Sequence, residues 1–252
     1  MTLSEVGIGG PSVTTVLDSP HAMPGQEVRG QLRVHGGAAA GEIGQVVLSL
    51  VTEMESETGL GGGAEYARLV VREGLRLAAG EPAILPFRLP VPWEMPITAV
   101  GGSPLPRSAA AIRTELMIPG TPGKGDLDWV RVNPLPAQQQ VLDAFGQLGF
   151  SLRGNGVEAG RVRGLPQELG SYQALTFRPP TRFADRIEQV ELIFVASRGE
   201  LCVRLTADRR EARFPHGDND FGDFRMSHLD ARVNDWAPMI SGWLTLTAER
   251  GQ

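Results

Sequence analysis

Hydrophobic and polar residues alternate along several stretches of the first half of the chain. In residues 46–54, Val46, Leu48 and Leu50 fall in phase, and they share one face of a strand because successive strand side chains point to opposite sides. Glycine or proline clusters separate these stretches at roughly the spacing typical of β-sandwiches. The predicted strands are residues 27–34, 46–54, 66–77, 83–89, 112–118 and 127–132. Together they predict one antiparallel β-sandwich.

The periodicity changes once, directly after the proline-containing stretch Asn133–Pro136. Val141, Leu142, Phe145 and Leu148 are spaced as on one face of a helix, so residues 137–148 are predicted to form a short helix. Because prolines and a change of period mark a domain boundary, we divide the chain into domains 1–133 and 134–252.

Strand-like patterns resume after this helix. The strongest are residues 190–195 and 201–205, which are joined by a hairpin-length turn containing Gly199. The complete set of predicted strands is 149–153, 171–177, 187–196, 201–206, 224–227 and 240–247. The sequence therefore predicts an all-β protein with two antiparallel β-sandwich domains in tandem and one short helix near the linker.

Composition agrees with many short strands and excludes a mechanism based on a basic surface. Hydrophobic residues make up 41% of the chain, and 32 glycines and 19 prolines supply abundant turn formers. The formal net charge is −5, which argues against electrostatic capture of nucleic acid or of an anionic membrane.

Cys202 is the only cysteine, so the chain cannot form an intramolecular disulfide or a cysteine-based metal cage. The first residues lack the basic and apolar regions of a signal peptide, and no run of residues is apolar for long enough to predict an integral membrane segment. These features together predict a cytoplasmic location.

Seven short motifs occur in an ordered series along most of the chain. They are Pro24–Gly37, Ile43–Leu50, Leu85–Pro96, Arg113–Ile118, Asp126–Pro134, the helix end Leu148–Phe150, and Ala207–Arg210. In order and spacing this series resembles the bacterial sporulation-control protein family. The acidic stretch that precedes the linker in that family is matched only in part here, by Asp126 and Asp128 within residues 123–128.

The resemblance implies a fold of two arrestin-like sandwiches and a non-enzymatic regulator of sporulation. Lys124 is the only lysine among the basic residues, which suggests a GC-rich genome such as that of an actinomycete. In a filamentous actinomycete, the resemblance implies a role in aerial-mycelium formation through protein contacts.

Catalytic and cofactor signatures are not found in the sequence. There is no G-x-S-x-G elbow and no cysteine–histidine signature, the four histidines are scattered, and Cys202 is interpreted as structural. We therefore predict no enzyme activity and no cofactor.

Three polar or glycine-rich stretches have simpler explanations than a site. The acidic stretch 216–224 offers clustered oxygens to a cation such as Ca²⁺, but turn geometry explains it better. Residues 59–64 lack the Lys-Ser/Thr of a phosphate loop, and Glu53, Glu55 and Glu57 fit an exposed strand face.

The remaining candidates are contacts with a partner or between domains. Trp93, in a proline-rich segment that cannot form a central strand, either meets a partner or packs at a sheet edge. A basic cluster fits an interdomain ion-pair zone better than a ligand site. The pair Trp236 and Trp243 fits either a core or an oligomer surface. The candidate contacts are Trp93, Asp126, Asp128, Arg204, Arg209, Arg210, Trp236 and Trp243.

The leading hypothesis is a cytoplasmic adaptor that recruits a protein partner of unknown identity through sheet edges and aromatic anchors, with homodimer formation expected from exposed edges. The alternative is a β-sandwich that binds a small ligand or carbohydrate, or an uncharacterised hydrolase, which requires a polar pocket with convergent side chains.

Overall fold

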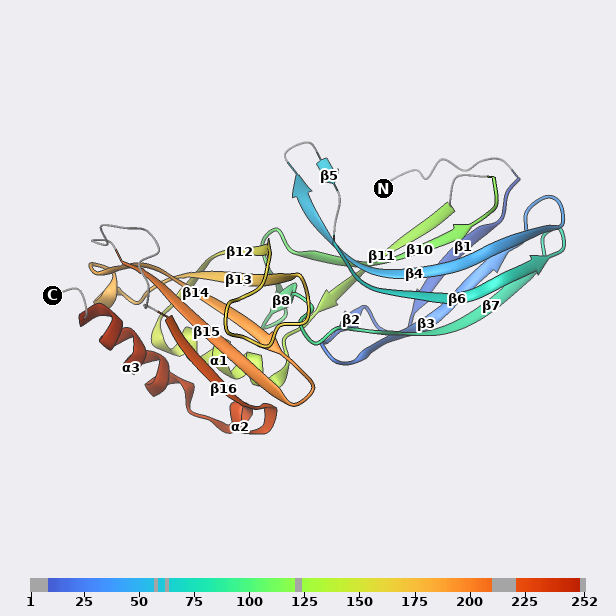
Figure 1. Cartoon of the computed structure of the whole chain (residues 1–252). Coiled ribbons are helices and arrows are strands. Elements are labelled where there is room, and N and C mark those ends of the chain that lie inside the picture. Colours follow the sequence, from blue (N-terminus) through green and yellow to red (C-terminus); the bar gives the residue numbers. More distant parts are fainter. Residues whose placement is uncertain (1–8, 57–58, 62–63, 121–123, 210–220, 250–252) are drawn as a thin grey trace. The chain divides into compact units, whose positions relative to one another are not determined.

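The computed structural model describes residues 9–56, 59–61, 64–120, 124–209 and 221–249 (Figure 1). The chain divides into two compact units. Unit 1 contains Met1–Pro92 and Ala109–Val132, and unit 2 contains Trp93–Ser108 and Asn133–Gln252. The segment Trp93–Ser108 therefore lies between two parts of unit 1 in the sequence but makes its contacts with unit 2.

Unit 1 is built from two mainly antiparallel sheets. The first has the order β1-β3-β7, formed by Ser12–Leu17, Glu27–His35 and Pro82–Pro90. The second has the order β2-β11-β10-β4-β5, with β6 also paired to β4. These strands are His21–Ala22 (β2), Lys124–Val132 (β11), Ala109–Met117 (β10), Gly41–Ser56 (β4), Gly59–Gly61 (β5) and Glu65–Leu77 (β6). Within this second sheet, β2 pairs with β11 in parallel.

The core of unit 1 follows the alternation of the sequence. Leu48 and Leu50 of β4 are fully buried and face Thr114 and Ile112 of β10 in register. On the other sheet, Leu32 and its in-phase neighbours are buried as well. All six strands predicted for the first half are confirmed, because alternation identifies a strand with one face in a core.

Strand β7 presents prolines at the free edge of its sheet. The Val91 amide donates to the Gln26 carbonyl. The backbone N–H and C=O groups of the odd residues of β7 therefore point toward β3, and those of the even residues point away from it. Pro82, Pro86 and Pro90 occupy even positions, where the missing N–H groups leave the pairing with β3 intact. An incoming strand would find few donors along this edge.

Unit 2 contains a five-stranded antiparallel sheet with the order β12-β13-β14-β15-β16. The strands are Ser151–Ala159, Ser171–Arg178, Ile187–Ala196, Glu200–Arg209 and Phe221–Ser227. A two-stranded ribbon, Ala99–Val100 (β8) with Ser103–Pro104 (β9), comes from the inserted segment. The helices are α1 (Pro136–Leu148), α2 (His228–Val233) and α3 (Trp236–Glu249), with a 3-10 turn at Thr181–Phe183 (Figure 1).

Helix α1 confirms the predicted helix. It begins at Pro136, whose fixed φ suits a first helical position, and it ends at Gly149, whose φ of 87° suits glycine. Phe145 of α1 packs 4.6 Å from the Phe177 ring of β13, measured between ring centroids. This aromatic contact joins the helix to one face of the sheet.

The strand predicted at residues 240–247 is wrong, because these residues belong to α3. Trp236, Ile240 and Leu244 are buried at a spacing of four residues, which places them on one helical face. Over eight residues the apolar pattern does not distinguish a buried helix from a strand. Helices α2 and α3 are additions to the single helix that the sequence predicts.

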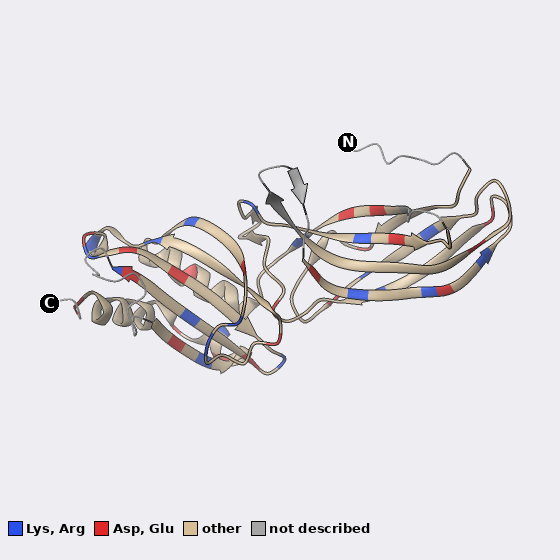
Figure 2. Cartoon of the chain, turned by 45° about the horizontal axis from the view of Figure 1, so that its top comes forward, with Lys and Arg blue, Asp and Glu red and all other residues tan. Residues whose placement is uncertain are grey.

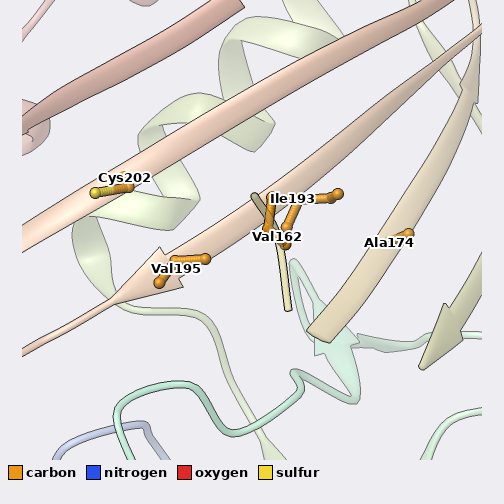
Figure 3. Packing of buried hydrophobic residues seen from close by; sticks show 5 residues of the cluster. All are labelled: Val162, Ala174, Ile193, Val195 and Cys202. Atoms are coloured by element: carbon orange, nitrogen blue, oxygen red, sulfur yellow. The ribbon is translucent and has the colours of Figure 1, made fainter. Parts of the chain in front are cut away.

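The opposite face of the same sheet is covered by the loop between β12 and β13. A cluster of buried side chains lies there, formed by Val162, Ala174, Ile193, Val195 and Cys202 (Figure 3). Leu165 of the loop and Tyr172 pack against this cluster. Both faces of the central strands are therefore buried, one under helices and one under a loop.

Candidate functional site

The predicted contact residue Trp93 lies against another side chain of unit 2. Its indole stacks on the imidazole of His228, with ring centroids 5.3 Å apart and an interplanar angle of 27°. His228 is the first residue of α2, and its Nε2 lies 2.8 Å from the Ser197 carbonyl oxygen. Of the two alternatives left open for Trp93, the geometry favours packing within the fold.

The rest of the inserted segment Trp93–Ser108 is tied to unit 2 by polar side chains. The Glu94 carboxylate accepts hydrogen bonds from the amides of Glu168 and Leu169 at 2.7 and 2.8 Å. The Gln173 side chain accepts from the Ile97 amide and donates to the Ile97 carbonyl, thus pairing with both backbone groups of one residue. These bonds make the segment a structural part of unit 2.

Gln167 holds the loop that covers the Cys202 cluster. Its side-chain oxygen accepts from the Val162 amide at 2.8 Å, and its side-chain nitrogen lies within 3.0 Å of three carbonyl oxygens. Those carbonyls belong to Gly160, Leu169 and Ser171. Gln167 is 5% exposed, so one buried amide pairs with four backbone groups of the loop and its ends.

Arg204 is anchored within unit 2. Its guanidinium donates to both carboxylate oxygens of Asp223, at 2.7 and 2.6 Å, and to the Arg163 carbonyl at 2.8 Å. It also lies 4.7 Å above the Phe221 ring. Since the side chain is 12% exposed, these contacts leave little of it for an external anion.

Arg209 and Arg210, the other predicted members of the basic cluster, do not form a site with Arg204 among the described residues. Arg209 is partly buried at the end of β15, and Arg210 lies outside the described residues. Basic and acidic residues are interspersed along the strands in Figure 2.

The two C-terminal tryptophans pack on the helix-covered face of the unit 2 sheet. Trp236 is 2% exposed, donates its indole N–H to the Ala231 carbonyl and meets the Phe224 ring edge-on. Trp243 lies over Gly222 of β16. The core alternative left open for this pair is therefore the one that the geometry favours.

Strand β11 has an inverted pattern. Alternation alone would bury Leu127 and Trp129 and expose the aspartates between them. Instead Trp129 is 51% and Leu127 38% exposed, whereas Asp126 and Asp128 are half-buried in phase with the buried Val130. The sequence pattern pointed to the aspartates but not to Trp129. What could have identified Trp129 is its place in a strand whose polar and apolar residues alternate.

The aspartates of β11 lie where the two sheets of unit 1 meet. The Thr15 amide of β1 donates to Asp126 at 3.0 Å, and the Thr15 and Thr114 hydroxyls lie 2.7 Å apart. The Asp128 carboxyl contacts Asp126 and Thr15. Burial, followed by the Asp126 charge, raises the pKa of Asp128 above its ordinary value.

The exposed side chains of β11 border a polar network on the outer face of the same sheet. Glu65 accepts from the Ser49 hydroxyl at 2.7 Å and pairs with Arg68 and Arg113 at 3.5 Å. Arg113 stands opposite Leu127 in register, so this network lies next to the exposed Leu127 and Trp129.

The described residues offer little support for catalysis or metal binding. Burial first, and the nearby Glu200 second, raise the pKa of the Cys202 thiol, which disfavours the nucleophilic thiolate. Within the described ranges, no group of three or more His, Cys, Asp or Glu side chains is arranged to hold a metal ion.

Some predictions fall outside the described residues. The acidic stretch 216–224 is undescribed up to residue 220, and its Asp223 pairs with Arg204. Glu57 and the side chains of Glu53 and Glu55 are likewise outside the described part. Of the glycine-rich stretch 59–64, Gly59–Gly61 forms β5. None of the helices described in the structure is long and apolar enough to cross a membrane.

A small pocket opens at one end of unit 1. Its volume is about 130 Å³, and its walls include Gly36, Gly37, Ile43, Leu77 and Ile118. The glycines and aliphatic side chains give it an apolar lining, with Glu42 as the charged residue at the wall.

Comparison with known proteins identifies a family for this chain. The family model described as SpoOM protein matches residues 1–211. The chain belongs to the SpoOM protein family. The sporulation-control protein spo0M of Bacillus subtilis (strain 168) is 29% identical over 211 residues, which cover 82% of this chain and 79% of that protein.

The fold of the SpoOM family is recognisable in three dimensions. The crystal structure of Spo0M from Bacillus subtilis superimposes with a TM-score of 0.79 at 24% identity, covering 95% of this chain and all of that chain. The predicted family and the predominantly β, arrestin-like fold class are therefore confirmed.

Proposed function

We propose that this protein is a non-enzymatic regulator of sporulation, acting in the cytoplasm through contacts with a protein partner. The observation that carries the proposal is the similarity to a sporulation-control protein over 82% of the chain. In a filamentous actinomycete, the same role extends to aerial-mycelium formation.

The outer face of β11 is the part of unit 1 that we assign to partner contact. Trp129 and Leu127 expose apolar surface there, beside the ion-pair network of Glu65 and Arg113. Tryptophan is enriched among residues that dominate binding energy, and a surrounding polar rim is typical of such anchors. Most of the contact residues nominated from sequence are engaged within their own unit, which leaves Trp129 as the better anchor.

The test combines genetics with co-purification from the native organism. Deleting the gene is expected to change sporulation, and the tagged full-length protein is expected to recover a reproducible partner during development. Trp129→Ala is expected to lose that partner and fail to complement the deletion. The matched control Leu152→Ala removes a side chain that is 39% exposed on unit 2 and is expected to retain both.

Two outcomes would contradict this proposal. Normal sporulation of the deletion strain would remove the developmental role, and full partner recovery by folded Trp129→Ala would remove the assigned surface. Homodimer formation belongs to the same proposal because exposed sheet edges favour pairing, and light scattering that shows a monomer at high concentration would exclude it.

The alternative, a sandwich that binds carbohydrate or another small ligand, gains no support from the pocket of unit 1. That pocket is apolar and small, whereas the alternative requires convergent polar side chains.

A further inference from the structure

Strand β1, at the edge of one sheet of unit 1, and strand β11, next to the short edge strand β2 of the other, are joined by a seam of polar side chains. The backbone amide of Thr15 faces away from β3 and donates to the Asp126 carboxylate at 3.0 Å. The other oxygen of Asp126 accepts from the Leu127 amide at 3.0 Å. Asp126 therefore satisfies a free donor on each of the two strands.

Asp128 follows Asp126 on the same face, and its surroundings suit a carboxylic acid better than a carboxylate. Its Oδ2 is buried and has no hydrogen-bond donor among the described residues. The carboxyl contacts Asp126, and two ionised carboxyls in contact repel each other. A proton on Asp128 turns an acceptor into a donor, and the neighbouring Asp126 carboxylate can accept from it.

The side chains that face Asp128 from neighbouring elements are uncharged, apart from Asp126. Residues Ser12–Leu17 of β1 carry no charge, and β10 presents Ile112 and Thr114 on this face. The charged Arg113 and Glu115 of β10 alternate to the outer face.

Two further charged positions lie near the ends of β11. Arg131 has the opposite phase to Asp128 and stands beside the exposed His21 of β2. Lys124 has the same phase as Asp126, and its side chain lies outside the described residues.

We propose that Asp126 and Asp128 form a proton-dependent latch between β1 and β11, in which one shared proton holds the two carboxyls together and its loss loosens β1. This role belongs to the interior of unit 1 and does not depend on the proposed regulatory function. It also explains the inverted pattern of β11, since departures from binary patterning concentrate at functional sites.

The direction of the pH effect follows from burial and repulsion, which together outweigh the Thr15 hydrogen bond that lowers the pKa of Asp128. Because both raise the pKa of Asp128 in the folded state, the folded protein keeps this proton at pH values where the unfolded chain has lost it. The stabilising contribution is complete below the ordinary aspartate pKa and is lost as the pH rises through the raised value. The latch is therefore closed in acid and weakened toward neutral and alkaline pH.

Hydrogen exchange of the full-length protein tests the latch directly. Protection of the β1 amides, corrected for intrinsic exchange, is measured between about pH 4 and about pH 8, where each unit of pKa shift corresponds to about a tenfold change in an equilibrium. We expect wild-type protection to fall at least about threefold across this range. Asp128→Asn, which mimics the protonated acid, is expected to remove that dependence.

Two control variants keep the test specific. Asp18→Asn replaces an exposed aspartate next to β1 and is expected to behave as wild type. Lys124→Gln is also expected to keep the pH dependence. If it loses the dependence, a lysine–aspartate pair rather than a shared proton joins the strands, and the proposal is overturned.

A carboxyl-carbon NMR titration of the wild-type protein provides a measurement that does not require the variants to fold. We expect the Asp128 carboxyl to titrate above the ordinary range of aspartate. Titration of Asp128 in the ordinary range of aspartate would refute the latch. So would unchanged pH dependence of β1 protection in Asp128→Asn.

Discussion

Gly222 of β16 leaves the space that the indole of Trp243 occupies. A Cβ atom built on Gly222 would lie 2.7 Å from Cδ1 and 2.8 Å from Nε1 of Trp243. Such distances are shorter than real carbon contacts allow, so the absence of a side chain at residue 222 lets α3 approach the sheet.

Gly222→Ala is therefore expected to destabilise the protein by about 1–3 kcal/mol, the usual range for forcing a carbon atom into a packed contact. Urea unfolding would measure the loss. Gly156→Ala is the matched control, because a Cβ there meets no atom within 4 Å. Equal stability of the two variants would show that α3 does not depend on this close approach.

Gln167→Ala is expected to loosen the loop over Cys202. Each hydrogen bond that the buried amide makes contributes roughly 0.5–1.5 kcal/mol, and the exposed backbone groups add to the cost. Because Cys202 is the only cysteine, its labelling by a thiol reagent reports loop opening without ambiguity. We expect faster labelling in this variant under native conditions.

The control for that experiment is Gln139→Ala, which removes a surface glutamine that bonds to Asp143 on α1. Its labelling rate should match that of the wild type. An unchanged rate in Gln167→Ala would mean that the loop stays in place without its central amide.

Tyr172 is expected to ionise late. Its hydroxyl donates to Glu158 at 2.6 Å, and that bond, followed by burial and the charges of Glu158 and Glu191, raises its pKa to about 12. The folded state then keeps the proton after the unfolded chain has lost it, so stability falls as the pH rises from about 10 toward about 12.

Absorbance titration in a Tyr66→Phe background isolates this ionisation, because the chain has two tyrosines. Glu158→Gln removes the charge and is expected to lower the Tyr172 pKa toward that of an ordinary tyrosine. If Tyr172 titrates near 10 in the folded protein, the hydrogen bond to Glu158 does not persist in solution.

Arg204→Lys tests whether the hydrogen bonds of the guanidinium stabilise unit 2. Lysine keeps the charge but cannot reach both Asp223 oxygens and the Arg163 carbonyl with one planar group. We expect a loss of about 1–3 kcal/mol in urea unfolding, as for hydrogen bonds to charged groups. Arg225→Lys, at a side chain that is 61% exposed, should lose less. The reverse order would contradict the assignment.

The regular strands and the first helix could be predicted from sequence because their patterns are local. In β4, Leu48 and Leu50 alternate with residues of the other face, and α1 has a helical spacing bounded by Pro136 and Gly149. Within residues 240–247 of α3 the apolar pattern does not distinguish a helix from a strand, and packing against β16 decides for the helix.

The candidate site was less accessible to sequence reasoning because its partners are distant in the chain. Asp126 was nominated from an acidic stretch, but its bond to Thr15 spans 111 residues and depends on how two sheets meet. Trp93 and Arg204 could be identified as unusual residues, whereas their contacts with His228 and Asp223 required the fold. Tertiary contacts, rather than local propensity, determine what such residues do.

The prolines of β7 limit how this protein can grow into larger assemblies. A sheet with few donors along one rim is a poor template for strand addition there, so polymerisation through that rim is disfavoured. We expect a partner that binds by adding a strand to use another border. The spacing of the three prolines thus disfavours fibre formation through this rim.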